Sequence, residues 1–285
     1  MSAPVGVAVR CVNVVQIYTT AGGHDVVALR GVNLDIAPGE RVALLGPSGS
    51  GKSTLLSLFG GVLRPSAGKV VVDGQDISRI RESDLGRLRS GTVASLLQGA
   101  SRNLLPYATP EENVDFARRA LGAAARRRLP SAAQLLEQLG MGPLVGRPLA
   151  TMSGGERQRV AFASAISSGA GLLLADEPTS QLSHDDRDSM IELIHAVNRE
   201  LGTTVVLVTH DPEVAAQLPR SITIRNGRIG SEGRHGFDFG VVDEDGAVHI
   251  PDDLAQRFPA GTLVQFEETP EGVMLRPIDE QGERS

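Results

Sequence analysis

The stretch of sequence that decides the fold is GPSGSGKS, at residues 46–53. It matches the pattern G-x-x-x-x-G-K-[S/T], in which the backbone N–H groups of a glycine-rich turn surround the phosphates of a nucleotide. Residues 41–45 before it form an apolar run typical of a buried strand, and residues 54–59 after it continue as a helix. The helix N-terminus adds the positive end of its dipole to the site. This context favours a phosphate-binding loop over a glycine-rich turn that fits the pattern by chance.

The residue types in this loop predict distinct roles in nucleotide binding. Lys52 would reach the β- and γ-phosphates, and the Ser53 hydroxyl would hold Mg²⁺. Lys52 and Lys69 are the only lysines among 28 basic residues. Because this chain otherwise uses arginine, the compact ammonium of a lysine at position 52 is stronger evidence for phosphate binding there. The predicted nucleotide-binding residues here are Gly46, Pro47, Ser48, Gly49, Ser50, Gly51, Lys52, Ser53 and Thr54.

The composition indicates a globular protein. The chain has 285 residues, of which 41% are hydrophobic, enough for one large domain with an appendage or for two modest domains. Cys11 is the single cysteine, so no disulfide within the chain is possible and a reducing compartment is expected. The sequence predicts no signal peptide. Its longest apolar runs, at 172–175 and 205–208, are far short of the roughly 20 residues that span a bilayer, and we expect a soluble polypeptide.

Charge is distributed unevenly along the chain. Residues 232–285 contain 13 acidic residues and 4 arginines, a net charge of −9, whereas residues 1–231 have a net charge of +3. The overall net charge of −6 is therefore a property of the C-terminal segment. This break predicts two domains, at 1–231 and 232–285.

Strands and helices alternate along the first 229 residues, which indicates a mostly parallel sheet with ligands at the carboxyl ends of its strands. A helical insertion is expected at about 99–168, because residues 111–129 and 131–139 have helical spacing between prolines. The three arginines at 126–128 fit a solvated helix end better than a nucleic-acid-binding patch. The predicted strands are 7–17, 26–36, 68–74, 92–97, 171–177, 203–208 and a hairpin at 221–229, with a further helix at 185–201.

Candidate catalytic residues follow the predicted strands. Asp176 and Glu177 are adjacent on a strand, so their side chains are expected on opposite faces and not in one shared site. Asp176 would face the Mg²⁺, and Glu177 would hold or deprotonate the water that attacks the γ-phosphate. Gln98 could contact Mg²⁺ or the water, and His210 could donate to the γ-phosphate. Tyr18, at the end of the first strand, could stack on an adenine ring or simply pack at the surface.

Five motifs follow one another along the chain: the phosphate loop, Gln98, SGGERQ at 153–158, LLLADEP at 172–178 and His210. Through these ordered motifs, residues 7–229 resemble the nucleotide-binding subunits of ABC transporters. Tyr18 matches the aromatic residue that stacks on adenine in that family. The resemblance implies an α/β fold, with a P-loop ATPase core and a helical subdomain, followed here by a small, mostly β C-terminal domain. Within the family, the sequence is most similar to the macrolide-exporter, lipoprotein-release and FtsE-like group.

The resemblance implies ATP hydrolysis with Mg²⁺ by a homodimer. The residues Ser153, Gly154, Gly155 and Glu156 begin a helix, whose N-terminus is a second anion site. In the family this site closes over the ATP of a facing subunit, and the helical region passes the motion to a separate integral-membrane permease at the inner face of the cell membrane. The expected partners are that permease and a second copy of this chain, and no nucleic acid is expected. The expected process is export or mechanotransmission. The alternative is a soluble non-transport ABC ATPase or an ATPase-linked regulator.

One position departs from the family pattern. Ser183 stands where the family usually has an aspartate that helps couple the two ATP sites. Asp185 and Asp186, displaced by two and three residues, are the candidates to replace it.

Three stretches of the acidic C-terminal segment are predicted as strands: DGAVHIP at 245–251, PAGTLVQF at 259–266 and GVMLRP at 272–277. With this pattern, residues 238–278 resemble the AbrB-type swapped-hairpin domain. Such domains usually bind DNA as dimers, but a net charge of −9 would repel phosphates. We interpret the segment as a dimerisation module, with a small β-appendage that has no role in dimerisation as the alternative.

Overall fold

The structure is a computed structural model of the whole chain. It describes residues 6–20, 22–234, 237–242, 246–248, 250, 254, 257–259 and 261–278.

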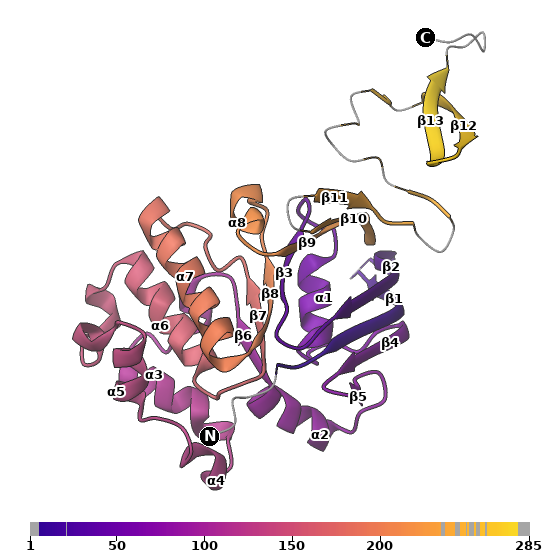
Figure 1. Cartoon of the computed structure of the whole chain (residues 1–285). Coiled ribbons are helices and arrows are strands. Elements are labelled where there is room, and N and C mark those ends of the chain that lie inside the picture. The colour runs from indigo at the N-terminus through magenta and orange to yellow at the C-terminus, as the bar shows by residue number, and fades with distance from the viewer. Residues whose placement is uncertain are drawn as a thin grey trace.

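A seven-stranded sheet of order β11-β10-β9-β3-β8-β7-β6 forms the centre of the molecule (Figure 1). The five strands from β9 to β6 are parallel, and β10 and β11 extend the sheet antiparallel at one edge. The predicted α/β architecture is therefore confirmed. The strands are β3 (Arg41–Leu45), β6 (Val93–Leu96), β7 (Leu172–Asp176), β8 (Thr204–Val208), β9 (Arg220–Arg225), β10 (Arg228–Arg234) and β11 (Phe237–Gly240).

A second, antiparallel sheet of order β2-β1-β4-β5 lies beside the first, with the phosphate-loop helix α1 (Lys52–Phe59) packed between them (Figure 1). Its longest strands are those predicted around Tyr18. The strands are β1 (Val9–Thr19), β2 (Asp25–Ile36), β4 (Ala67–Val72) and β5 (Gln75–Asp76).

The alternation of side chains along the central strands builds two separate cores. In β3, Val42 and Leu44 pack with α1 and the antiparallel sheet, whereas Ala43 packs on the opposite face with α6 (Gly154–Ile166) and α7 (His184–Leu201). Parallel strands buried on both faces are expected to be continuously apolar, and β8 is buried at all five positions. The carboxyl ends of β7 and β8 are thereby fixed beside the phosphate loop.

The helical insertion is more broken than the sequence predicts. Residues 111–129 form α3 (Pro110–Ala117), a 3₁₀ turn and the short helix α4 (Ala123–Arg126) instead of one helix. The buried Arg118 side chain donates to the carbonyl oxygens of Ser167 and Pro130, at 3.0 and 2.8 Å, which holds the chain where α3 ends. The remaining helices are α2 (Glu82–Arg87), α5 (Ala132–Gln138) and α8 (Pro212–Ala216), of which α2 and α8 are not predicted from the sequence.

The C-terminal strands β12 (Leu263–Thr269) and β13 (Gly272–Ile278) form a two-stranded antiparallel sheet of their own. Of the predicted strand at 245–251, residues 246–248 and 250 are described, and among these Val248 forms an isolated bridge with Val242. Within the described part of the chain, no helix combines the length and the apolar character that crossing a membrane requires.

Candidate nucleotide-binding site

The phosphate loop turns tightly between β3 and α1. Gly46 has a φ of 142°, and a Cβ on it would lie 2.1 Å from the carbonyl oxygen of Ile224 in β9. Gly51 has a φ of 108°, and its Cβ would lie 2.7 Å from the carbonyl oxygen of Ala28 in β2. Only glycine fits these two positions, because each combines left-handed backbone with the close approach of another strand.

A cavity of about 540 Å³ opens above this loop. The cavity brings together most of the residues that the sequence nominates for phosphate, Mg²⁺ and water. Gly46, Pro47 and Tyr18 are not among its lining residues. Ala28 and Val208 line it without any signal in the sequence that could have found them. The lining residues are Ala28, Ser48, Gly49, Ser50, Gly51, Lys52, Ser53, Thr54, Gln98, Asp176, Glu177, Val208 and His210.

Lys52 is held against the loop by its own ammonium group. Its Nζ donates to the carbonyl oxygens of Gly46 and Pro47, at 2.7 and 2.8 Å. Burial lowers the pKa of Lys52 below its ordinary value, and the carboxylates of Glu177 and Asp176 oppose that shift. The cavity thus places one cation opposite two anions.

Ser53 and Asp176 are linked directly across the cavity. The Ser53 hydroxyl donates to Asp176 Oδ1 at 3.3 Å, which joins the start of α1 to the end of β7. Gln98, exposed just after β6, lines the same space. The three side chains present only oxygen and amide groups, a donor set suited to a hard divalent cation.

Glu177 and His210 form the second linked pair. His210 Nδ1 lies 2.8 Å from Glu177 Oε1, and the Glu177 N–H donates to the carbonyl oxygen of Val208 at 3.0 Å. The expectation that Asp176 and Glu177 occupy separate sites is wrong, since both line this cavity. The strand ends at Asp176 and Glu177 has a φ of 49°, so the alternation of a strand does not apply to it.

Tyr18 lies at the end of β1, next to the start of α1. Its hydroxyl is 3.3 Å from Thr54 Oγ1, and 37% of the residue is exposed. An exposed ring that is tied to the phosphate loop can present a face to a planar ligand.

The SGGE segment begins α6 and does not line the cavity of its own chain. The Ser153 hydroxyl accepts from the Glu156 N–H at 3.0 Å, and Glu156 Oε2 accepts from the Ser153 N–H at 2.7 Å, which is a complete capping box. This hydrogen bond from Ser153 lowers the pKa of Glu156. Ser153 and Gly154 are exposed, so this helix N-terminus is open to a ligand brought by another molecule.

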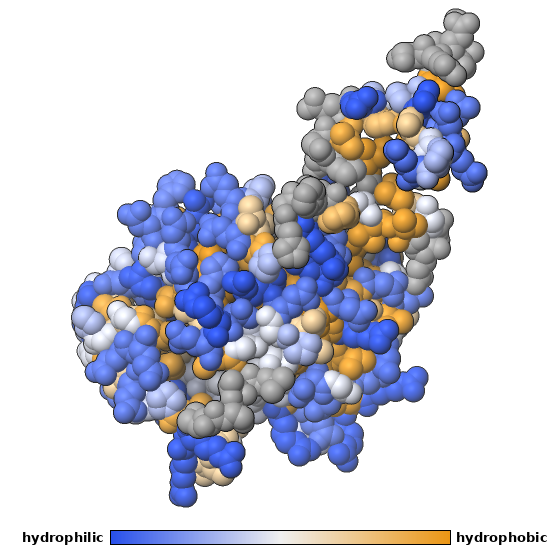
Figure 2. All heavy atoms as spheres, in the orientation of Figure 1, coloured by the Kyte–Doolittle hydropathy of each residue, from blue (hydrophilic) through white to orange (hydrophobic). Residues whose placement is uncertain are grey.

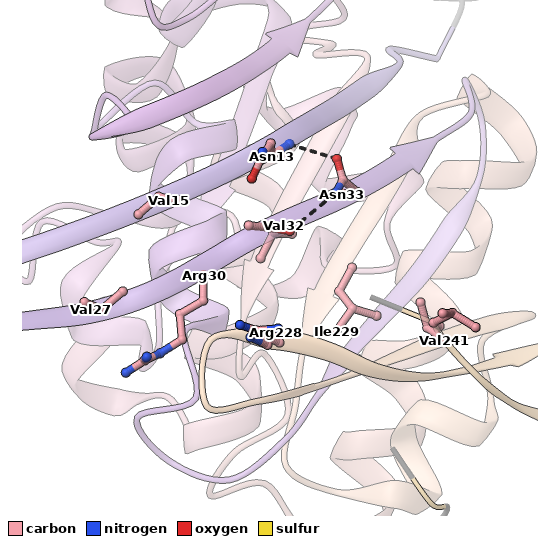
Figure 3. A pocket seen from close by; sticks show the side chains of 11 residues that line it. Asn13, Val15, Val27, Arg30, Val32, Asn33, Arg228, Ile229 and Val241 are labelled. Atoms are coloured by element: carbon pink, nitrogen blue, oxygen red, sulfur yellow. Dashed lines mark hydrogen bonds between the residues drawn. The ribbon is translucent and has the colours of Figure 1, made fainter. Parts of the chain in front are cut away.

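A different hollow, of about 490 Å³, lies between β1, β2 and the segment after β11 (Figure 3). Its lining includes Arg30 of β2 and Arg228 of β10, together with valines of β1 and β2. None of the predicted site residues lines it.

Comparison with known proteins identifies the family. The model of the ABC transporter family matches residues 29–180. The lipoprotein-releasing system ATP-binding protein LolD 2 of Caulobacter vibrioides is 41% identical over 214 residues, which cover 75% of this chain and 92% of that protein. The macrolide export ATP-binding/permease protein MacB of Marinobacter nauticus is 41% identical over 73% of this chain, but only 32% of that protein is covered.

The solved structures agree with these relatives. The dimeric structure of MJ0796, a bacterial ABC transporter cassette, has a TM-score of 0.69 at 33% identity and covers 80% of this chain and 100% of that one. A second structure of that cassette, in a post-hydrolysis state bound to ADP and Pi, has a TM-score of 0.70. The chain therefore belongs to the ABC transporter family, as an ATP-binding subunit related to LolD and MacB.

Proposed function

We propose that the chain hydrolyses ATP to power a separate membrane permease, through the closure of a homodimer at the inner face of the membrane. The observation that carries the proposal is the meeting of Lys52, Ser53, Asp176, Glu177 and His210 around one cavity. The relative LolD 2 supports an ATP-binding subunit that is separate from the permease, since it is named as the ATP-binding protein of a releasing system. The transport is export or mechanotransmission, and we expect no nucleic-acid partner.

The residues of the cavity divide the reaction among them. Lys52 and the loop N–H groups would hold the phosphates, and Tyr18 would stack on the adenine. A bound Mg²⁺ would be held by Ser53, Asp176 and Gln98, and would neutralise charge that develops on the β- and γ-phosphates.

Glu177 and His210 would act on the attacking water and the γ-phosphate. The water oxygen forms a bond to the γ-phosphorus, its proton passes to the Glu177 carboxylate, and the bond between the γ-phosphorus and the β–γ bridging oxygen breaks to release ADP. His210 Nδ1, which contacts Glu177 Oε1, orients that carboxylate and leaves its other ring nitrogen for the γ-phosphate. The pair therefore links the base to the γ-phosphate side of the site.

The SGGE segment, which is exposed at Ser153 and Gly154, would complete the ATP site of a second copy. Ser153, Gly154, Gly155 and Glu156 lie outside the cavity of their own chain, so a role in ATP binding requires a facing subunit. Two copies would enclose two ATP molecules, and hydrolysis would reopen them.

Co-expression with a candidate permease, sought among the genes that neighbour the gene of this chain, tests the permease half of the proposal. We expect the two to co-purify in detergent, with ATPase activity above that of the chain alone. A matched Lys52→Ala complex should co-purify and show no activity. If the two proteins never associate and the chain hydrolyses ATP at full rate alone, the chain is a non-transport ATPase.

We further propose that the acidic segment 232–285 is an AbrB-like dimerisation module. Its first residues complete β10 and form β11 of the central sheet, so the part that would form the dimer follows Gly240. Phe266 pairs with Leu275 in the β12–β13 hairpin, on the same face as Val273, and Phe266 and Val273 are 67% and 60% exposed. Apolar side chains are visible together on this part of the surface (Figure 2). A hollow of about 1190 Å³ lies between the hairpin and the described residues Gly246, Ala247, Val248, Ile250, Leu254, Arg257 and Phe258. A two-stranded hairpin is marginally stable alone, so a second copy would supply the missing core.

A chain that ends at Gly240 is expected to be mostly monomeric without nucleotide, whereas the full chain should be a dimer in light scattering. The ATPase activity of the shortened chain should depend more steeply on protein concentration than that of the full chain. In the full chain, the tail would raise the effective concentration of the partner subunit. Ending at Gly240 keeps Glu232, whose carboxylate accepts from the buried Arg220 at 2.7 Å.

Point variants separate the hairpin face from a general effect of truncation. Phe266→Glu should give monomers, while Gln265→Glu adds the same charge on the opposite face of β12 and should leave a dimer. Equal oligomeric states for the full and shortened chains would assign the tail to another role.

A further inference from the structure

The first turn of α7 packs directly against the start of α6. Asp186, in this turn, lies so close to Gly155 that a Cβ on the glycine would be 2.2 Å from the Asp186 Cγ. Arg159, one turn further along α6, donates from Nη1 to Asp186 Oδ1 at 2.9 Å. One carboxylate thus contacts the helix that carries Ser153 at two points.

Ser183 fixes this carboxylate from the other side. Its hydroxyl donates to Asp186 Oδ2 at 3.0 Å and also accepts from the Asp186 N–H at 3.3 Å. Ser183 is the N-cap of α7, so the loop that follows the catalytic strand β7 is tied to the same carboxylate. Both oxygens of Asp186 are therefore engaged within the chain.

The neighbouring residue continues the connection toward the catalytic histidine. Arg187 Nη1 lies 3.2 Å from Asp211 Oδ2, and Asp211 follows His210 directly. The two residues 186 and 187 accordingly link the start of α6 with the loop that carries His210. By contrast, Asp185 is exposed, and the described residues provide no hydrogen bond or ion pair to its carboxylate.

We propose that Asp186 is a positioning residue for hydrolysis at the facing subunit's ATP. Its carboxylate holds the first turn of α6, and with it Ser153 and Gly154, in the orientation that receives the partner's nucleotide. Ser183 supports that carboxylate through its hydroxyl, and the Asp186–Arg159 ion pair provides a charged contact between α7 and α6. The inference rests on the proposed homodimer, in which Ser153 acts on the nucleotide of the other chain.

The test compares the full-length variants Asp186→Ala and Arg159→Gln. Each should lower kcat about tenfold or more, because small misplacements of a binding group are costly, while ATP binding stays within about twofold. The double variant should be no slower than the slower of the two single variants, since each single variant already removes the same Asp186–Arg159 contact. Glu200→Ala removes a carboxylate from the exposed last turn of α7 and should leave kcat unchanged.

Mixed dimers of two differently tagged chains locate the effect. With Lys52→Ala and Asp186→Ala on one chain, the remaining phosphate loop faces the altered α6, and activity should fall below that of the Lys52→Ala/wild-type dimer. With the two changes on separate chains, activity should equal that of the Lys52→Ala/wild-type dimer. Equal losses in both arrangements would show a merely structural role.

Besides equal losses in the two mixed dimers, three results for the homodimers would overturn the assignment. They are a kcat for Asp186→Ala equal to that of Glu200→Ala, a parallel loss of ATP binding, and a loss for Asp185→Ala but not for Asp186→Ala. If a mixed dimer with one Lys52→Ala chain is inactive altogether, the kcat values of the homodimers decide. Full activity of a Ser153→Arg chain run alongside would instead overturn the proposed homodimeric site.

Discussion

The Glu177→Gln chain is expected to bind ATP normally and to hydrolyse it about a hundred to ten thousand times more slowly, the usual contribution of a general base. Glutamine has the shape of glutamate and can still contact His210 and the cavity, but it cannot accept the proton of the attacking water. The Glu177 side chain is only 12% exposed, and its Oε1 lies 2.8 Å from His210 Nδ1. Apart from Glu177, Asp176 is the only described carboxylate that lines the cavity, and Asp176 is assigned to the Mg²⁺. ATP should accordingly accumulate in a closed dimer.

The measurement combines steady-state hydrolysis with gel filtration in ATP. Lys52→Ala is the contrasting variant, because it removes the cation from the phosphate loop and should weaken ATP binding itself. Wild-type turnover of Glu177→Gln would show that another group activates the water.

The phosphate loop and its surroundings could be predicted because their chemistry is local in sequence. A glycine-rich run between an apolar strand and a helix has one structural outcome, and the cavity above residues 48–54 follows from it. Gln98 and His210 could be placed because each follows a strand of a parallel sheet, and such strands end at one edge. The separation of Ser153 from that cavity could be expected because Ser153 belongs to the predicted helical insertion and not to the strands that end at the cavity.

The details that could not be predicted depend on backbone conformation and on contacts between distant segments. The φ of 49° at Glu177 brings two carboxylates into one cavity, and no residue type in the sequence announces it. The contact of Asp186 with Gly155 joins segments about thirty residues apart, although the S-x-x-D spacing of Ser183 and Asp186 could have predicted a helix cap. The break after α3 depends on carbonyl groups that only the folded chain brings to Arg118.

The Ser153→Arg chain is expected to lose hydrolysis by more than about a hundredfold while it retains ATP binding, because a bulky cation would displace the partner's nucleotide from its binding geometry. Ser153 is exposed and does not line the cavity of its own chain, so binding to Lys52 of the same chain should persist. The change also removes the N-cap of α6, which costs about 1 kcal/mol of stability.

Ser131 provides the matched control for that loss of stability. It caps α5 in the same way, with its hydroxyl accepting from the Gln134 N–H at 3.1 Å and its own N–H donating to Gln134 Oε1 at 2.8 Å. Ser131→Arg should therefore lower the melting temperature to a similar extent and leave hydrolysis intact. If the two variants lose activity equally, the effect of Ser153→Arg is one of folding.

Mixing decides whether Ser153 acts within its own chain or on the facing one. In a dimer of one Ser153→Arg chain and one Lys52→Ala chain, the phosphate loop of the first faces the intact SGGE segment of the second, which leaves one complete site. That dimer should hydrolyse ATP like the dimer of Lys52→Ala with wild type. A chain carrying both changes, paired with wild type, has no complete site, because the intact loop faces the altered SGGE segment and the intact segment faces the altered loop; it should be inactive. Activity in the second pairing but not in the first would place Ser153 at the ATP of its own chain, against the exposure of this helix N-terminus and its separation from the cavity.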